Sequence, residues 1–263
     1  MNRTLYLECT SGVSGDMLLG ALSHAAHGFG IPFSQLQELV SALPLAGADV
    51  TVEEKTLNGI STWHVDVLQE SDQPLRTLPQ ILPIIQGADV PQSVKDRAEY
   101  GFQLLAKAEA HVHGTTVDDV HFHEVGAVDT VVDILGASYL LALLQVDRVV
   151  VSPVDMGAGF INISHGRVPV PAPAVAELAC GLEIFSSMVP PEGCETATPT
   201  GLALLRAMSA VSGPMPKGRL LSVGYGSGGR SCDAFPSCVR AFVMAITAQE
   251  FNTSAGEGGD CND

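Results

Sequence analysis

Residues 131–152, VVDILGASYLLALLQVDRVVVS, decide the fold class of this chain. Residues 131–144 have the length and apolar character of a buried helix, and the β-branched run at 148–152 is typical of a buried strand. A second such unit lies at the start of the chain, where a strand at 5–9 and a Gly/Ser loop at 11–16 precede a helix at 17–27. Alternating helices and strands predict an α/β fold with a partly parallel sheet and flanking helices.

The remaining patterns extend this fold over most of the chain. Two strands, 48–53 and 62–68, should turn at Asn58-Gly59, which is a strong hairpin signal. Prolines and glycines between 153 and 173 predict a long loop over the body. Further helices are expected at 36–43, 93–110, 173–180, ended by Gly181, and 199–209, with a closing strand at 241–247. We expect a single domain over 1–247, with two lobes meeting near 148–166 as the alternative, and a disordered tail at 248–263.

Composition excludes several classes of function. The chain has 263 residues, 46% of them hydrophobic, which is enough for a substantial core. Its 13 basic and 29 acidic residues give a net charge of −16, so nucleic acid would be repelled. The longest apolar stretch, 134–146, is shorter than the roughly twenty residues of a membrane span. No secretory signal is visible, and the six cysteines form no CxxC pair, so we expect a cytoplasmic protein with reduced thiols.

Side chains that can bind metals are concentrated between residues 111 and 133, where four of the eight histidines lie. On an extended backbone His121 and His123 would share one face, because side chains alternate along a strand, and both imidazoles could then reach one ion. Imidazoles mixed with carboxylates favour a divalent transition metal. The candidate ligands are His121, His123, Glu124, Asp129 and Asp133.

A structural interpretation of the same residues stays open. Asp129 and Asp133 stand four apart near the start of the helix predicted at 131–144, where the helix dipole favours carboxylates without any metal. Surface or hydrogen-bonded histidines could simply precede that helix. His111 and His113 are weaker candidates, because they fall at the end of the preceding helix.

Two other segments have features of anion sites. The loop 11–16 places Ser11, Gly12, Ser14 and Gly15 before a helix, where free amides attract anions, although Asp16 would repel a phosphate that has no neutralising metal or cation. Alternatively, Ser14 caps this helix and Asp16 meets its dipole.

The same choice applies to Thr198 and Thr200, which either cap the helix that starts there or contact an anion. His165 and Arg167 could bring an imidazole and a guanidinium to a phosphate or carboxylate. No Gly-x-Ser-x-Gly elbow supports a hydrolase with a covalent nucleophile.

Taken together, these motifs resemble the LarC family of nickel-insertion proteins. The resemblance rests on the order and spacing of residues 11–22, 121–133, 165–173, 198–201 and 224–228. It implies that the protein inserts nickel into pyridinium-3,5-bisthiocarboxylic acid mononucleotide, in a CTP-dependent step, to form the nickel-pincer cofactor of lactate racemase-type enzymes. Such an insertion needs displaceable metal ligands and a base for the ring proton. Glu124 is the candidate base, and Asp16 is a second candidate catalytic residue.

Members of this family usually continue into a C-terminal domain, and some are encoded in two segments. We therefore expect this chain to be the first segment, with CTP and Mg²⁺ or Mn²⁺ binding in the missing domain. Partners would be the mononucleotide substrate and either that C-terminal segment or further copies of the chain. Two alternatives from other classes are a nickel delivery module without catalysis and a metal-dependent phosphate-ester hydrolase.

Overall fold

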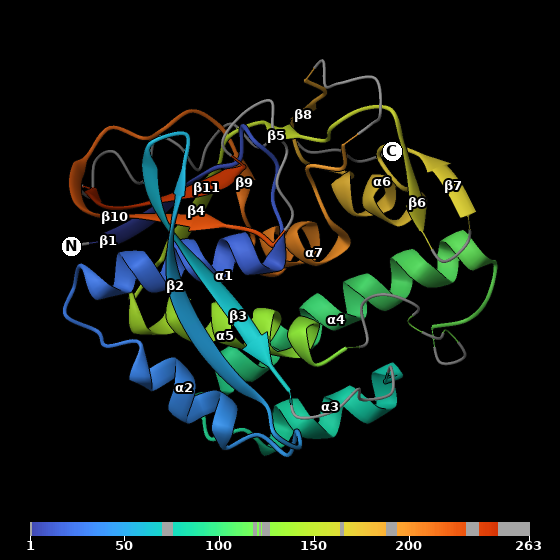
Figure 1. The fold of residues 1–263 in the computed structure, drawn as a ribbon, viewed down its shortest axis with the longest axis horizontal. Helices are drawn as coiled ribbons and strands as arrows, with labels where there is room; N and C mark the ends of the chain where they lie inside the picture. Colours follow the sequence, from blue (N-terminus) through green and yellow to red (C-terminus); the bar gives the residue numbers. More distant parts are fainter. Residues whose placement is uncertain are drawn as a thin grey trace.

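The largest sheet in the described part of the molecule is mixed and has seven strands, with most of the helices on one side of it (Figure 1). The computed structural model describes residues 2–69, 76–117, 120, 122, 127–163, 166–187, 194–229 and 237–246. The strand order is β2-β3-β10-β11-β1-β4-β9. These strands are β1 (Asn2–Glu8), β2 (Asp49–Leu57), β3 (Ile60–Leu68), β4 (Arg148–Val151), β9 (Val211–Ser212), β10 (Arg219–Ser227) and β11 (Cys238–Ile246).

The strand pairing confirms the predicted α/β fold with a partly parallel sheet. The pairs β1–β4, β4–β9 and β3–β10 are parallel, whereas β1–β11, β10–β11 and β2–β3 are antiparallel. The hairpin β2–β3 turns at Asn58 and Gly59, both with positive φ, as the sequence predicts.

Helices cover one side of this sheet in Figure 1. Their bounds are α1 (Gly15–His27), α2 (Ser34–Ser41), α3 (Leu78–Gly87), α4 (Gln92–His113), α5 (Val128–Leu143), α6 (Pro173–Ala179) and α7 (Pro199–Ala207). Helix α5 is buried along most of its length and packs against α1 and α4. Its apolar residues join one continuous core with those of α1, so α5 is the core helix expected from residues 131–144. No helix among the described residues is long and apolar enough to cross a membrane.

Glycines allow α1 to lie directly on β10. A Cβ added at Gly226 would lie 2.0 Å from the Met17 carbonyl oxygen, and one at Gly224 would lie 2.0 Å from that of Ala21. Gly20 on the helix side approaches the backbone of Trp63 on β3 in the same way. The helix and the sheet therefore meet backbone to backbone, and any side chain at these positions would separate them.

The predicted loop at 153–173 is wrong in part. The segment contains β5 (Val154–Asp155), which pairs with β8 (Ile184–Phe185), and an antiparallel hairpin of β6 (Phe160–Ile163) and β7 (Gly166–Pro169). Prolines are tolerated here because Pro169 ends its strand, where no ladder hydrogen bond is lost. Helix α6 ends before Gly181, whose φ of 88° confirms the predicted stop.

Candidate functional site

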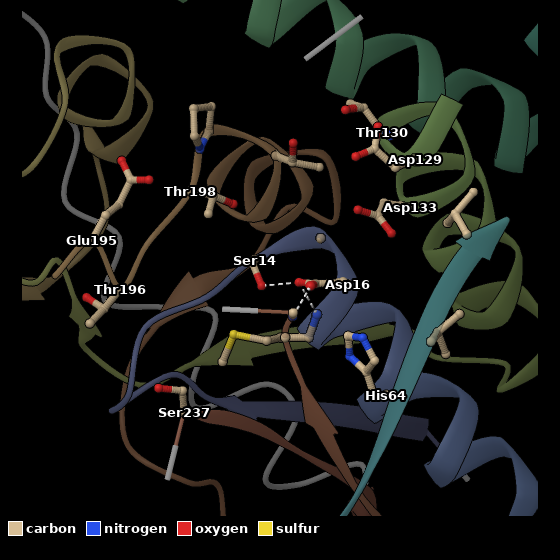
Figure 2. A pocket seen from close by; sticks show the side chains of 18 of the residues that line it. Ser14, Asp16, His64, Asp129, Thr130, Asp133, Glu195, Thr196, Thr198 and Ser237 are labelled. Carbon is tan, nitrogen blue, oxygen red and sulfur yellow. Dashed lines mark hydrogen bonds between the residues drawn. The ribbon is translucent and has the colours of Figure 1, made fainter. Parts of the chain in front are cut away.

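A cavity of about 590 Å³ lies where the start of α1 meets β3, the first turn of α5 and the segment before α7 (Figure 2). Its wall includes carboxylates, hydroxyls and one imidazole. No lysine or arginine is among the described residues that line it. The described wall is therefore acidic and favours cations over free anions.

The loop before α1 is held in place by the segment that precedes α7. The Val13 amide donates to the Thr196 carbonyl at 2.9 Å, and the Thr198 amide donates to the Val13 carbonyl at 2.9 Å. Gly12 has a φ of 89°, and a Cβ there would lie 1.9 Å from the Thr196 oxygen. Glycine is therefore required at this position both for backbone conformation and for space.

Asp16 is fixed at the start of α1 by three donors. The Ser14 hydroxyl and the Met17 amide (2.8 Å) donate to Oδ1, and the Gly229 amide donates to Oδ2 at 2.8 Å. Ser14 occupies the N-cap position, but its side chain makes no capping hydrogen bond. The interpretation that Ser14 caps the helix is therefore wrong, because its hydroxyl is used to orient Asp16 instead.

Two carboxyl groups from the start of α5 lie near Asp16 (Figure 2). Asp133 is only 9% exposed, and its Oδ2 lies 2.3 Å from where a Cβ on Gly15 would stand. Burial raises the pKa of Asp133 well above its ordinary value, and the nearby charges of Asp16 and Asp129 raise it further. Asp129, in the first turn of α5, is exposed, and its Oδ1 accepts from the Thr130 amide at 2.8 Å. The charges of Asp16 and Asp129 therefore both act on the buried carboxyl group of Asp133.

His64 and Asp66 on β3 complete the described wall. The buried ring of His64 places Nδ1 2.9 Å from the Ser227 carbonyl oxygen and Nε2 2.9 Å from Asp66 Oδ1. Which ring nitrogen donates depends on the tautomer of His64, and the two contacts fix the orientation of the ring. The sequence analysis missed this pair. The signal was available, because residues two apart on a strand share a face.

The structure brings together many of the residues singled out by sequence. Those that line the cavity are Ser11, Ser14, Gly15, Asp16, Asp129, Asp133, Thr198 and Thr200. Thr198 also caps α7, since its hydroxyl accepts from the Gly201 amide at 3.2 Å, so the capping interpretation is confirmed for this residue. Thr200 is buried beside Gly15.

Other predicted site residues lie elsewhere. Arg167 is on β7 with its guanidinium 4.9 Å from the centre of the Phe160 ring, and it does not line the cavity. His111, near the end of α4, forms a 2.8 Å contact with Glu177. Within the described ranges no three His, Cys, Asp or Glu side chains are grouped as a metal site. The predicted residues His121, His123, Glu124 and His165 lie outside the described residues.

Comparison with known proteins identifies relatives over nearly the whole chain. The model of the family described as nickel insertion protein matches residues 5–258. A protein of Desulfitobacterium hafniense, named pyridinium-3,5-bisthiocarboxylic acid mononucleotide nickel insertion protein, is 42% identical over 94% of this chain and 60% of its own length. A protein of the same name from Acetivibrio thermocellus is 38% identical over 89% of this chain and 58% of its own length.

These relatives are longer than the chain. A relative from Desulfotalea psychrophila, 42% identical, is matched over 92% of this chain and 61% of its own length. The chain thus spans about three fifths of the length of the curated relatives it matches. No solved structure matches it.

Proposed function

The chain belongs to the nickel insertion protein family, and we propose that it takes part in inserting nickel into pyridinium-3,5-bisthiocarboxylic acid mononucleotide, the substrate named for its relatives. Nickel is a substrate of this reaction. The observation that carries the proposal is the cavity, because four of the five stretches on which the resemblance rests contribute to its wall: 11–22, 121–133, 198–201 and 224–228.

The chemistry sets requirements for the site. Nickel must bind two thiocarboxylate sulfurs and replace the proton on the ring carbon between them, so its protein ligands must be displaceable and a base must take the proton. We propose His121, His123 and Glu124 as the nickel ligands and Glu124 as the proton acceptor. In support, these residues directly precede α5, whose first turn bears Asp129 on the cavity wall. Asp16 is the second candidate for proton transfer, since three donors fix its orientation.

The substrate's phosphate is assigned to the start of α1. Ser14, Gly15 and the hydroxyls of Thr198 and Thr200 surround this helix end in the cavity wall. Helix N-termini attract phosphate through their free amides. His165 and Arg167 remain predicted contacts of the phosphate. Arg167 is less favoured than His165 for this role, because it lies on β7, outside the cavity wall.

The CTP-dependent step is assigned to the part of the relatives that this chain does not span. We propose that CTP, with Mg²⁺ or Mn²⁺, binds in the part of the family's length that lies outside the match, and that the matched part supplies the nickel and the mononucleotide sites. Assembly with further copies of the chain is the other arrangement compatible with the family resemblance. The roughly two fifths of the relatives' length that lies outside the match leaves room for such a site.

Nickel titration calorimetry on the purified chain tests the metal assignment. Wild type should bind Ni²⁺, and His121→Ala/His123→Ala should lose at least about ten-fold in affinity, since two ligands are removed. His111→Ala is the matched control, because it removes an imidazole that contacts Glu177 outside the cavity. Equal nickel affinity in wild type and the double variant would sink the assignment.

Cofactor formation tests the reaction itself. The chain is mixed with Ni²⁺, the apo-substrate, CTP and Mg²⁺, with and without the C-terminal part of a full-length relative, and the cofactor is followed by absorbance and mass. Formation only in the complete mixture supports the proposal. Nickel binding with no product in any mixture indicates a delivery module, and release of phosphate from simple phosphate esters indicates a hydrolase.

A further inference from the structure

The acidic wall of the cavity contains a carboxyl group that the proposed nickel chemistry leaves without a role. Asp133 is nine-tenths buried, lines the cavity and makes no hydrogen bond or ion pair with any described residue. Buried polar groups are nearly always satisfied by a partner. Among the described residues, the charges of Asp16 and Asp129 act on Asp133, and both repel its ionised form. A cation would be attracted by all three carboxyl groups and would give Asp133 a partner.

The donor atoms around Asp133 are oxygens. Besides the carboxylates of Asp16 and Asp129, the adjoining wall presents the hydroxyls of Ser14 and Thr200. Carboxylate and hydroxyl oxygens suit hard ions such as Mg²⁺ and Mn²⁺, whereas imidazole suits nickel and its neighbours in the transition series. The described wall therefore differs in chemistry from the histidine segment that precedes α5.

The cavity also needs a positive charge if a phosphate is to enter it. The described lining has five carboxylate side chains, Asp16, Asp66, Asp129, Asp133 and Glu195, and no lysine or arginine. His64 is the single imidazole among them, and its two ring nitrogens already face Ser227 and Asp66. A phosphate dianion at the start of α1 would be repelled unless a cation lay between it and these acids.

We propose that Asp133 binds a hard divalent cation, Mg²⁺ or Mn²⁺, which its acidic neighbours Asp129 and Asp16 help to attract and which bridges Asp133 to the phosphate of the mononucleotide. This inference rests on the proposed function for the identity of the phosphate. No group of three or more His, Cys, Asp or Glu side chains among the described residues could hold a metal ion by itself, so the cation has to be one that needs few protein ligands, such as Mg²⁺. It commonly keeps several waters and takes one or two carboxylates together with substrate phosphate oxygens.

The proposal divides the metal ligands predicted from sequence into two sets. His121, His123 and Glu124 remain the ligands assigned to nickel, the ion that is transferred. Asp129 and Asp133 join Asp16 at a second ion, which stays in the cavity and positions the phosphate. In the sequence, the histidine segment precedes α5, and Asp129 and Asp133 lie within α5.

Mn²⁺ binding to the full chain tests the second ion, because protein-bound Mn²⁺ loses the electron paramagnetic resonance signal of the free ion. The titration is run with Mn²⁺ alone and with Mn²⁺ plus nicotinic acid mononucleotide, a pyridinium mononucleotide with the same phosphate. We expect one bound Mn²⁺ that Mg²⁺ displaces. The mononucleotide should raise the affinity for Mn²⁺ at least about five-fold, and Mn²⁺ should raise the affinity for the mononucleotide by the same factor. Absence of Mn²⁺ binding, or indifference to the mononucleotide, overturns the bridge.

Matched substitutions locate the ion. Asp133→Asn should weaken Mn²⁺ binding about ten-fold or more, whereas Asp89→Asn, which removes an exposed carboxylate outside the cavity, should leave it unchanged. Circular dichroism checks folding, and Mn²⁺ should raise the melting temperature of wild type but not of Asp133→Asn. Equal Mn²⁺ affinity in wild type and Asp133→Asn contradicts the assignment.

A second variant separates this inference from the proposed function. His121→Ala/His123→Ala should lose nickel but keep Mn²⁺, and loss of both ions would mean a single shared site and overturn the two-ion proposal. Retained Mn²⁺ binding without any nickel insertion would leave the cation site standing and remove the insertion function.

Discussion

Replacement of Gly226 by alanine should separate α1 from β10. The new Cβ would lie 2.0 Å from the Met17 carbonyl oxygen and 2.2 Å from the Ala21 amide nitrogen. Both are backbone atoms of α1, so no side chain can rotate to make room. Bringing the first contact out to 3.4 Å requires a shift of about 1.4 Å between helix and strand.

The expected cost follows from the rigidity of these neighbours. Overpacking of a well-packed core costs about 1–3 kcal/mol, and contacts with backbone place this change near the upper end, at about 3 kcal/mol. With a urea dependence of about 1–3 kcal/mol per M, the unfolding midpoint should fall by about 1–3 M. Asp16 moves with α1 away from the Gly229 amide on the sheet side, so Mn²⁺ affinity should fall as well.

Urea unfolding, followed by the fluorescence of Trp63, measures this effect. Gly87→Ala is the matched control, because a Cβ there meets no atom within 4 Å and its φ is not left-handed. It should change the free energy of unfolding by less than about 1 kcal/mol, towards greater stability. A Gly226→Ala midpoint indistinguishable from that of wild type would refute the inferred backbone contact between helix and strand.

Three further outcomes are expected. Burial lowers the pKa of His24, so the unfolded chain takes up a proton at a higher pH than the folded chain does. Wild type should therefore lose stability as pH falls from about 7 to about 5, and His24→Gln should not show this loss. Parallel curves of urea midpoint against pH for the two proteins would contradict this. Thr198→Ala should cost about 1 kcal/mol in urea unfolding through loss of the α7 cap, and a cost below about 0.3 kcal/mol would show the cap to be unimportant. Burial raises the pKa of the Cys9 thiol, so a thiol reagent should label exposed Cys180 in the native protein and Cys9 only after unfolding, as peptide mass spectrometry would reveal.

The elements predicted from sequence are those whose apolar pattern is carried by their own side chains. Helix α5 and strand β4 were expected because they are continuous apolar runs, and β2–β3 because Asn58-Gly59 fixes its turn. Strand β10 was missed because Gly224 and Gly226 fill the positions that face α1. Its inward face therefore shows no hydrophobic alternation, and only the approach of the helix explains the glycines.

The candidate site was predictable in its residue types but not in its assembly. Asp129, Asp133 and Asp16 were singled out as acids near helix starts, yet their meeting depends on the contact between α1 and α5. His64 was overlooked because it lies on a hairpin far from the histidine-rich segment in sequence. Its place in the wall depends on the parallel pairing of β3 with β10, which no local pattern specifies.

The absence of a side chain at Gly15 gives a way to separate cation binding from stability. A Cβ there would lie 2.3 Å from Asp133 Oδ2 and 2.7 Å from the Thr200 methyl group, which are both side-chain atoms. Asp133 Oδ2 is the end of a side chain, so it can shift at less cost than the backbone atoms that Gly226→Ala would meet. Gly15→Ala should therefore weaken Mn²⁺ binding about as much as Asp133→Asn, while lowering the urea midpoint less than Gly226→Ala does. Unchanged Mn²⁺ affinity in this variant would mean that cation binding does not depend on the position of the Asp133 carboxyl group next to the first turn of α1.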